Sequence, residues 1–164
     1  DKIIHQKLEP LFIDMRGADW ISADEYTPRM DAQRFEDWEF PYALVLGSKA
    51  AVDYALAIGL HEIKERNTHI GDQIRNALAM LPVRLLDLGT EQSSIITVEI
   101  PRKAPAVLTA LRAENINTSV GHRSFALLDF DVKKVDWALR ISPHYYNTEE
   151  EVNTLVAAIK KIVV

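Results

Sequence analysis

Residues 137–159, "WALRISPHYYNTEEEVNTLVAAI", decide the fold of this chain. The segment begins with a short apolar run that predicts a strand. A helix follows from Thr148, which forms a capping box with Glu151. An arginine, Arg140, lies inside the strand, and a permanent cation in such a run calls for a physical reason. The apolar positions behind the cap recur at helical spacing and predict a buried stripe: Val152, Leu155, Val156, Ile159 and Val163.

Strand alternation gives Arg140 a particular setting. Leu139 and Ile141 point to one face, while Ala138, Arg140 and Ser142 point to the other. Small residues beside a guanidinium leave room for a ligand, and a guanidinium binds carboxylates through two parallel hydrogen bonds at any working pH. The alternative is an arginine that extends to solvent or pairs with a nearby carboxylate. Periodicity alone favours this alternative.

The residues upstream alternate between strand and helix patterns. Strands are predicted for 83–88, for 93–100 and for 116–120, which ends at Gly121, and a helix is predicted for 104–115. Together with the last strand and helix they predict an α/β or α+β domain over 82–164. Its sheet is expected to be small, mostly antiparallel and covered by helices.

The part before residue 82 divides into two regions. Residues 42–59, "YALVLGSKAAVDYALAIG", are apolar nearly all round and predict a buried helix. A second, amphipathic helix is expected to follow Gly59 and to end at Pro82, so 42–81 forms a pair of long helices. Residues 1–41 are expected to be an irregular connector, with a short amphipathic helix over 1–9.

Composition narrows the function classes. The net charge of −5 argues against nucleic acid or an acidic membrane surface as the main partner. The absence of cysteine excludes disulfides, thiolate metal sites and a cysteine nucleophile in this chain, and it fits a cytoplasmic protein. No apolar stretch predicts a membrane span. The chain does not begin with Met, and we expect it to be a piece of a longer or processed protein.

Other candidate sites are few. Gly121-His122-Arg123-Ser124 follows a predicted strand, where ligand-binding loops often lie. His122 could exchange protons near neutral pH, although on its own an ordinary loop histidine is the favoured interpretation. Ser124 has no evident base partner. His61 and Glu65 share a helix face, but without a second histidine they predict no metal site.

Four segments together resemble one family. They are "RFEDWE" (34–39), "AAVDYALAIGLHEIKER" (50–66), "GHRS" (121–124) and "LRISPHYYNTEEEVNTLVAAI" (139–159). In this order they resemble the class V aminotransferases, which are fold-type-I enzymes that use pyridoxal 5′-phosphate (PLP). Cysteine desulfurases, selenocysteine lyases and isopenicillin N epimerase-like proteins belong to that family.

The resemblance implies roles for particular residues. An arginine at the position of Arg140 holds the α-carboxylate of the amino-acid substrate in that family. The loop residues His122, Arg123 and Ser124 would lie on the substrate side. A homodimer is implied by family habit. The reaction stays open between transamination, elimination, epimerisation and decarboxylation.

The departures from the family pattern also carry information. Group II cysteine desulfurases have a sulfur-accepting cysteine on the loop where this chain has Ser124, and a serine cannot hold a persulfide. We therefore expect epimerase-like or carbon–sulfur lyase members to be closer. Relatives continue "RFE" with a Gly-Thr pair whose threonine reaches the cofactor phosphate of the partner subunit. Asp37-Trp38-Glu39 stands here instead, so that contact is not expected.

The resemblance also predicts what lies outside the chain. The family's Schiff-base lysine precedes the segment that corresponds to Asp1, and neither Lys2 nor Lys7 is a candidate for it. Residues 1–41 would then be a connector from the large PLP domain, 42–81 connecting helices, and 82–164 the small domain. The chain alone is expected to be inactive. The alternative is a free-standing αβ module that binds a small carboxylate or mediates dimerisation.

Overall fold

The computed structural model describes residues 8–164. The chain divides into two compact units, Asp1–Tyr54 and Ala55–Val164. The short helix predicted over 1–9 falls almost entirely outside the described residues. The second unit carries most of the buried apolar side chains and the site discussed below.

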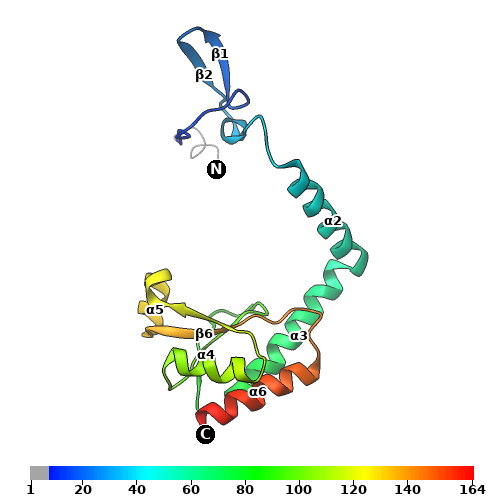
Figure 1. Cartoon of the computed structure of the whole chain (residues 1–164), viewed down its shortest axis with the longest axis vertical. Helices are drawn as coiled ribbons and strands as arrows, with labels where there is room; N and C mark the ends of the chain where they lie inside the picture. Colours follow the sequence, from blue (N-terminus) through cyan, green and yellow to red (C-terminus); the bar gives the residue numbers. More distant parts are fainter. Residues whose placement is uncertain (1–7) are drawn as a thin grey trace. The chain divides into compact units, whose positions relative to one another are not determined.

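The first unit contains a β-hairpin where the sequence predicted an irregular connector. Strands β1 (Ala18–Ser22) and β2 (Glu25–Pro28) pair antiparallel, and the 3₁₀ helix η1 (Ala32–Phe35) follows (Figure 1). The prediction missed this hairpin because its turn lacks the Asn-Gly or Asp-Gly signal and its strands are mostly exposed, so apolar alternation is weak. Arg34 is buried, and its guanidinium donates hydrogen bonds to the carbonyl oxygens of Arg29 at 2.7 Å and Leu8 at 2.8 Å. These bonds connect η1 to the residues on either side of the hairpin.

Helix α2 (Tyr42–Ile58) forms where the sequence predicted it, but the prediction of burial is wrong for the described residues. None of its side chains is buried. The sequence is apolar nearly all round, which is typical of a helix covered on several sides. No described segment provides that cover. Among the described residues no single helix is long and apolar enough to span a membrane; α2 and the next helix pass that test only as a bent pair, by length and composition.

Helix α3 (Leu60–Ala79) is the first helix that lies wholly in the second unit, which is built on one four-stranded sheet. Every neighbouring pair is antiparallel, in the order β3-β4-β6-β5. This confirms the predicted small antiparallel sheet. The strands are β3 (Arg84–Leu85), β4 (Ile96–Glu99), β5 (Ser119–His122) and β6 (Trp137–Ile141).

Helices cover one face of this sheet. Helix α6 (Glu149–Val163) contacts both α3 and α4 (Ala104–Ala113), and the three helices pack against the apolar side of β4 and β6 (Figure 1). The predicted stripe of α6 contributes to this core. The fully buried side chains of the core are Ile70, Ile74, Leu78, Ile96, Val98, Ile100, Val107, Leu111, Leu139 and Ile159.

The opposite face is covered only in part. A short helix that the sequence analysis did not predict, α5 (Leu127–Lys133), places Phe130 against Ala138 together with Leu86 and Val135. Gly121 permits this packing, since a Cβ there would lie 3.3 Å from the Phe130 ring. Ala138 is buried as a result, while Arg140, two residues further along β6, stays exposed.

Candidate functional site

Arg140 lies on the less covered face of the sheet, as strand alternation predicted. Its neighbours Leu139 and Ile141 are 0% and 4% exposed on the core side, whereas Arg140 is exposed. Across the sheet it lies opposite Thr97 on β4 and Ser119 on β5. Two residues with short hydroxyl side chains therefore flank Arg140 on the neighbouring strands, so its small neighbours extend over three strands.

No described residue pairs with the Arg140 guanidinium, although carboxylates lie nearby. Glu99 is on the same face of β4, diagonal to Arg140, and it accepts from Arg84 Nε at 2.7 Å. Asp87 lies just beyond β3 and accepts from Arg75 Nε at 3.0 Å. Within the described part of the chain, Arg140 is thus an exposed cation with open donors. Of the two forms of the alternative, pairing with a carboxylate has no support there, whereas extension to solvent fits the exposure of Arg140.

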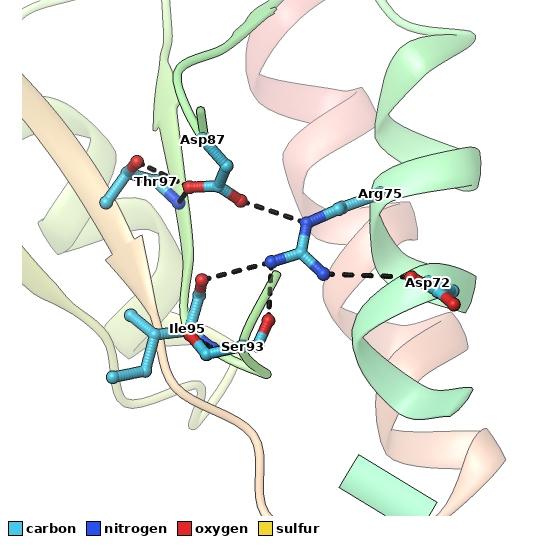
Figure 2. A network of polar contacts seen from close by, with 6 residues as sticks. All are labelled: Asp72, Arg75, Asp87, Ser93, Ile95 and Thr97. Atoms are coloured by element: carbon cyan, nitrogen blue, oxygen red, sulfur yellow. Dashed lines mark hydrogen bonds and ion pairs between the residues drawn. The ribbon is translucent and has the colours of Figure 1, made fainter. Parts of the chain in front are cut away.

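A polar network lies beside this face (Figure 2). Arg75, on α3, is only 8% exposed and also donates to the carbonyl oxygens of Ser93 at 2.6 Å and Ile95 at 3.2 Å. The other oxygen of Asp87 accepts from the Thr97 backbone N–H at 2.8 Å and from the Thr97 hydroxyl at 2.7 Å. Asp72 adds a longer ion pair to Arg75 at 3.8 Å. Sequence reasoning missed this network because its members are distant in the chain.

In this network a side-chain carboxylate continues the hydrogen bonding between β3 and β4 beyond the end of β3. The Leu86 N–H still donates to the Thr97 carbonyl at 2.9 Å, and then the Asp87 carboxylate takes the place of a backbone acceptor for the Thr97 N–H. Charge-assisted hydrogen bonds of this kind are stronger than neutral ones. This explains why β3 contains only Arg84–Leu85 although the sequence predicted a strand over 83–88.

The structure places His122, Arg123 and Ser124 at the other end of β5. His122 is opposite Trp137, three residues along the strand from the Ser119–Arg140 pair, which is about 10 Å at the usual rise per residue. The Arg123 guanidinium pairs with Asp131, which raises the pKa of Arg123 and lowers the pKa of the Asp131 carboxyl. Ser124 is exposed in a 3₁₀ turn. These residues do not contact Arg140 within this chain.

A separate cavity of about 470 Å³ lies at the N-terminal end of α6. Core residues Ile74 and Ile141 line its apolar side, and Glu150 and Thr118 belong to its polar lining. The cavity is not lined by Arg140, so the two features are independent. No group of His, Cys, Asp and Glu that could hold a metal occurs among the described residues; His61 and Glu65 form only an exposed pair at 3.2 Å.

The described residues around Arg140 could bind a carboxylate, but they offer no attachment point for PLP. PLP attaches through its aldehyde to a lysine amine. None of the four strands around Arg140 contains a lysine. Lys133 is comparatively enclosed, with a side chain 14% exposed, but it is paired with Asp129 at 2.8 Å. The described part of this chain therefore offers a cation for a carboxylate and no free enclosed amine for the cofactor.

Comparisons with known proteins agree on the family. The family profile for "Aminotransferase class-V" matches residues 2–155. A "Probable cysteine desulfurase" of Halalkalibacterium halodurans is 25% identical over 157 residues, which is 95% of this chain and 38% of that protein. The chain thus spans well under half the length of this relative.

Solved structures agree on the fold. The cysteine desulfurase CsdA from Escherichia coli superposes with a TM-score of 0.82 and 19% identity, over 100% of this chain and 42% of its own. A mutant of C-DES with glycine covalently linked to its PLP cofactor has a TM-score of 0.68 and 20% identity, over 92% of this chain and 37% of its own. The chain belongs to the aminotransferase class-V family, whose members depend on pyridoxal 5′-phosphate.

Proposed function

We propose that this chain is the substrate-carboxylate-binding part of a PLP-dependent enzyme that acts on an amino acid. Arg140 would hold the α-carboxylate. One observation carries the proposal: in a chain of this family, Arg140 is exposed, lies in register between two residues with short hydroxyl side chains and has no carboxylate partner among the described residues. A homodimer and a cytoplasmic location remain predictions.

Arg140 suits this role chemically. Its planar guanidinium presents two parallel N–H groups to the two oxygens of a carboxylate and keeps its charge at any physiological pH. When the amino group is also held, a fixed carboxylate restricts rotation about the Cα–N bond and so sets which Cα bond faces the reacting group. When bound in the intact protein, PLP supplies an electron sink for the carbanion character that develops at Cα.

The reaction class follows in part from what the chain lacks. The sequence contains no cysteine, so no persulfide can form on this chain. We therefore favour an amino-acid reaction without a thiol acceptor on this chain, such as carbon–sulfur lysis, epimerisation or transamination. The cystine C-S lyase C-DES shares the fold at a TM-score of 0.68.

The first test uses the natural protein that contains these residues. We expect a visible absorption band that borohydride bleaches, with the cofactor then fixed to one lysine peptide. Arg140→Gln should keep the band but raise the KM for a converted amino acid, with L-cysteine and L-alanine as probes, by about 10- to 100-fold, since hydrogen bonds to a charged group contribute about 1.5–3 kcal/mol.

The matched control is Arg112→Gln. Arg112 is an exposed arginine on α4, so this variant removes the same charge away from the proposed site and should leave KM unchanged. An unchanged KM in Arg140→Gln would refute the role of Arg140. A colourless protein that takes up no added PLP would instead favour the second candidate function, a module that binds a small carboxylate at Arg140 without cofactor chemistry.

A further inference from the structure

Two carboxylates near Arg140 on the β3–β4 side of the sheet pair with other arginines. Glu99 and Asp87 are the acidic side chains that adjoin its face through β4, and each makes an ion pair with a different arginine. The Arg84–Glu99 pair is about half exposed and therefore weak. The Arg75–Asp87 pair differs because its side chains are only 9% and 12% exposed.

Thr97 connects Asp87 to Arg140 across the sheet, because it binds Asp87 and is the cross-strand neighbour of Arg140. Both the N–H and the carbonyl of Thr97 are bonded on the β3 side, to Asp87 and Leu86. Thr97 and Arg140 are therefore a pair without hydrogen bonds between their backbones, the closer kind in an antiparallel sheet, with Cα atoms about 4.5 Å apart. Asp87 also contacts the Thr97 hydroxyl, which is on the face of Arg140.

We propose that Arg75 is a positioning residue for Arg140. By neutralising Asp87 and fixing it against Thr97, Arg75 keeps this carboxylate from pairing with the Arg140 guanidinium and so leaves that guanidinium open to an external carboxylate. Without Arg75, Asp87 would be a largely buried anion with no counter-charge, which is costly. Arg140, the cross-strand neighbour of Thr97, is a cation that no described residue engages.

Thr97 contributes a second effect. Its hydroxyl proton is donated to Asp87, so its oxygen can only accept hydrogen bonds from the Arg140 side. The hydroxyl therefore supports a guanidinium donor and does not compete for it. The consequence for substrate binding rests on the proposed function of Arg140, but the effect of Arg75 on the Arg140 guanidinium does not.

The test measures the reactivity of the Arg140 guanidinium directly. Phenylglyoxal modifies arginines that are exposed and unpaired, and mass spectrometry of the Arg140 peptide gives its rate in the natural protein. We expect Arg75→Gln to slow modification of Arg140 about tenfold, the factor that corresponds to a pair of 1.4 kcal/mol. The double variant Arg75→Gln/Asp87→Asn should restore the wild-type rate, because residue 87, which lies against Thr97, then carries no charge.

A matched variant separates charge from packing. Arg75→Lys keeps a cation beside Asp87 but loses the planar fork that also binds the Ser93 and Ile95 carbonyls. It should lower the thermal midpoint of unfolding like Arg75→Gln and yet leave the Arg140 rate near wild type. The rate at exposed Arg112 is the internal reference and should be equal in every variant.

Two outcomes would overturn the proposal. In the first, Arg75→Gln leaves the Arg140 rate unchanged or raises it. In the second, Arg75→Gln slows the rate but the double variant fails to restore it. A purely structural role of the network predicts one or the other of these outcomes. The proposed function fails by a different measurement, an unchanged KM in Arg140→Gln. The two failures are thus distinguishable.

Discussion

At the scale of single residues, the arginines of this chain differ sharply in burial and in hydrogen bonding. Arg34 and Arg75 are 5% and 8% exposed and donate hydrogen bonds to carbonyl or carboxylate oxygens. Arg140 is exposed, and no described residue accepts from its guanidinium. Their burial does not follow from residue type, since arginine is mostly exposed in folded proteins. It follows from which acceptors the fold brings within reach of each guanidinium.

A prediction at this scale concerns Gly17. A Cβ at this buried glycine would lie 2.7 Å from the backbone carbonyl oxygen of Arg34, which cannot move aside like a flexible side chain. We expect Gly17→Ala to destabilise the hairpin unit by about 1–3 kcal/mol, the usual cost of overpacking. Faster hydrogen exchange at the Arg29 amide, which donates to the Gly17 carbonyl at 2.8 Å, would report this.

Gly47→Ala is the control for this prediction. Gly47 lies inside α2, and no atom outside its own helix turn lies within 4 Å of the position that an alanine methyl group would take. Alanine should therefore stabilise that helix by about 0.5–1 kcal/mol through helix propensity. Equal effects of the two substitutions would show that the contact with Arg34 is not what matters at Gly17.

At the scale of elements, local sequence signals were reliable where the partner atoms are close in the chain. The capping box of α6 is present as predicted: Thr148 Oγ1 accepts from the Glu151 N–H at 3.2 Å, and Glu151 Oε2 accepts from the Thr148 N–H at 2.8 Å. Helix α5 was missed because it has only seven residues and no side-chain cap. Its existence depends on Phe130 finding a place against the sheet.

The capping box predicts a pH dependence of stability. The Thr148 backbone N–H, with Asn147, holds the pKa of Glu151 below its ordinary 4.5. A carboxyl group whose pKa is lower in the folded than in the unfolded protein stabilises the folded state above pH 4.5. This stabilisation is lost as the pH falls through the pKa of the folded state. We expect the thermal midpoint of unfolding to fall more steeply in wild type than in Glu151→Gln below pH 4.5.

Glutamine suits this comparison because its amide oxygen can still accept from the Thr148 N–H, so only the charge is removed. Asp14 and Asp131 also have lowered pKa values. Both residues are present in wild type and in Glu151→Gln, so their contributions cancel when the two midpoint curves are subtracted. Parallel midpoint curves for wild type and Glu151→Gln would contradict the assignment to Glu151.

At the scale of the whole molecule, buried apolar area is distributed unevenly between the two units. The core lies in Ala55–Val164, where α3 contributes Ile70, Ile74 and Leu78. Helix α2 contributes no buried side chain among the described residues. Since most helix stability in proteins comes from packing an apolar face, the two helices should differ in stability.

Hydrogen exchange of the 164-residue chain tests this difference. We expect the amides of α2 to exchange faster than those in the second half of α3, which pack against the core. The comparison should be repeated after dilution, because association of exposed apolar helices would also slow exchange. Equal protection of both helices in dilute samples would show that α2 is stabilised without burial.

The sequence determined the features that depend on neighbours along the chain. These include the alternation that places Leu139 in the core and Arg140 outside, the helices α3, α4 and α6, and the antiparallel sheet class. The resemblance to the family was also readable from local motifs, and the family profile confirms it. The strand alternation and the helices rest on periodicities of two or 3.6 residues and on caps, which act over one or two turns.

Only the tertiary structure decided what surrounds the candidate site. Sheet register places Thr97 and Ser119 beside Arg140 and separates His122 from it, and α3 brings Arg75 to Asp87. Register and helix docking are set by the packing of the whole core, so no local pattern specifies them. The charge of Arg140 belongs to its sequence, whereas its freedom from a carboxylate partner is a property of the fold.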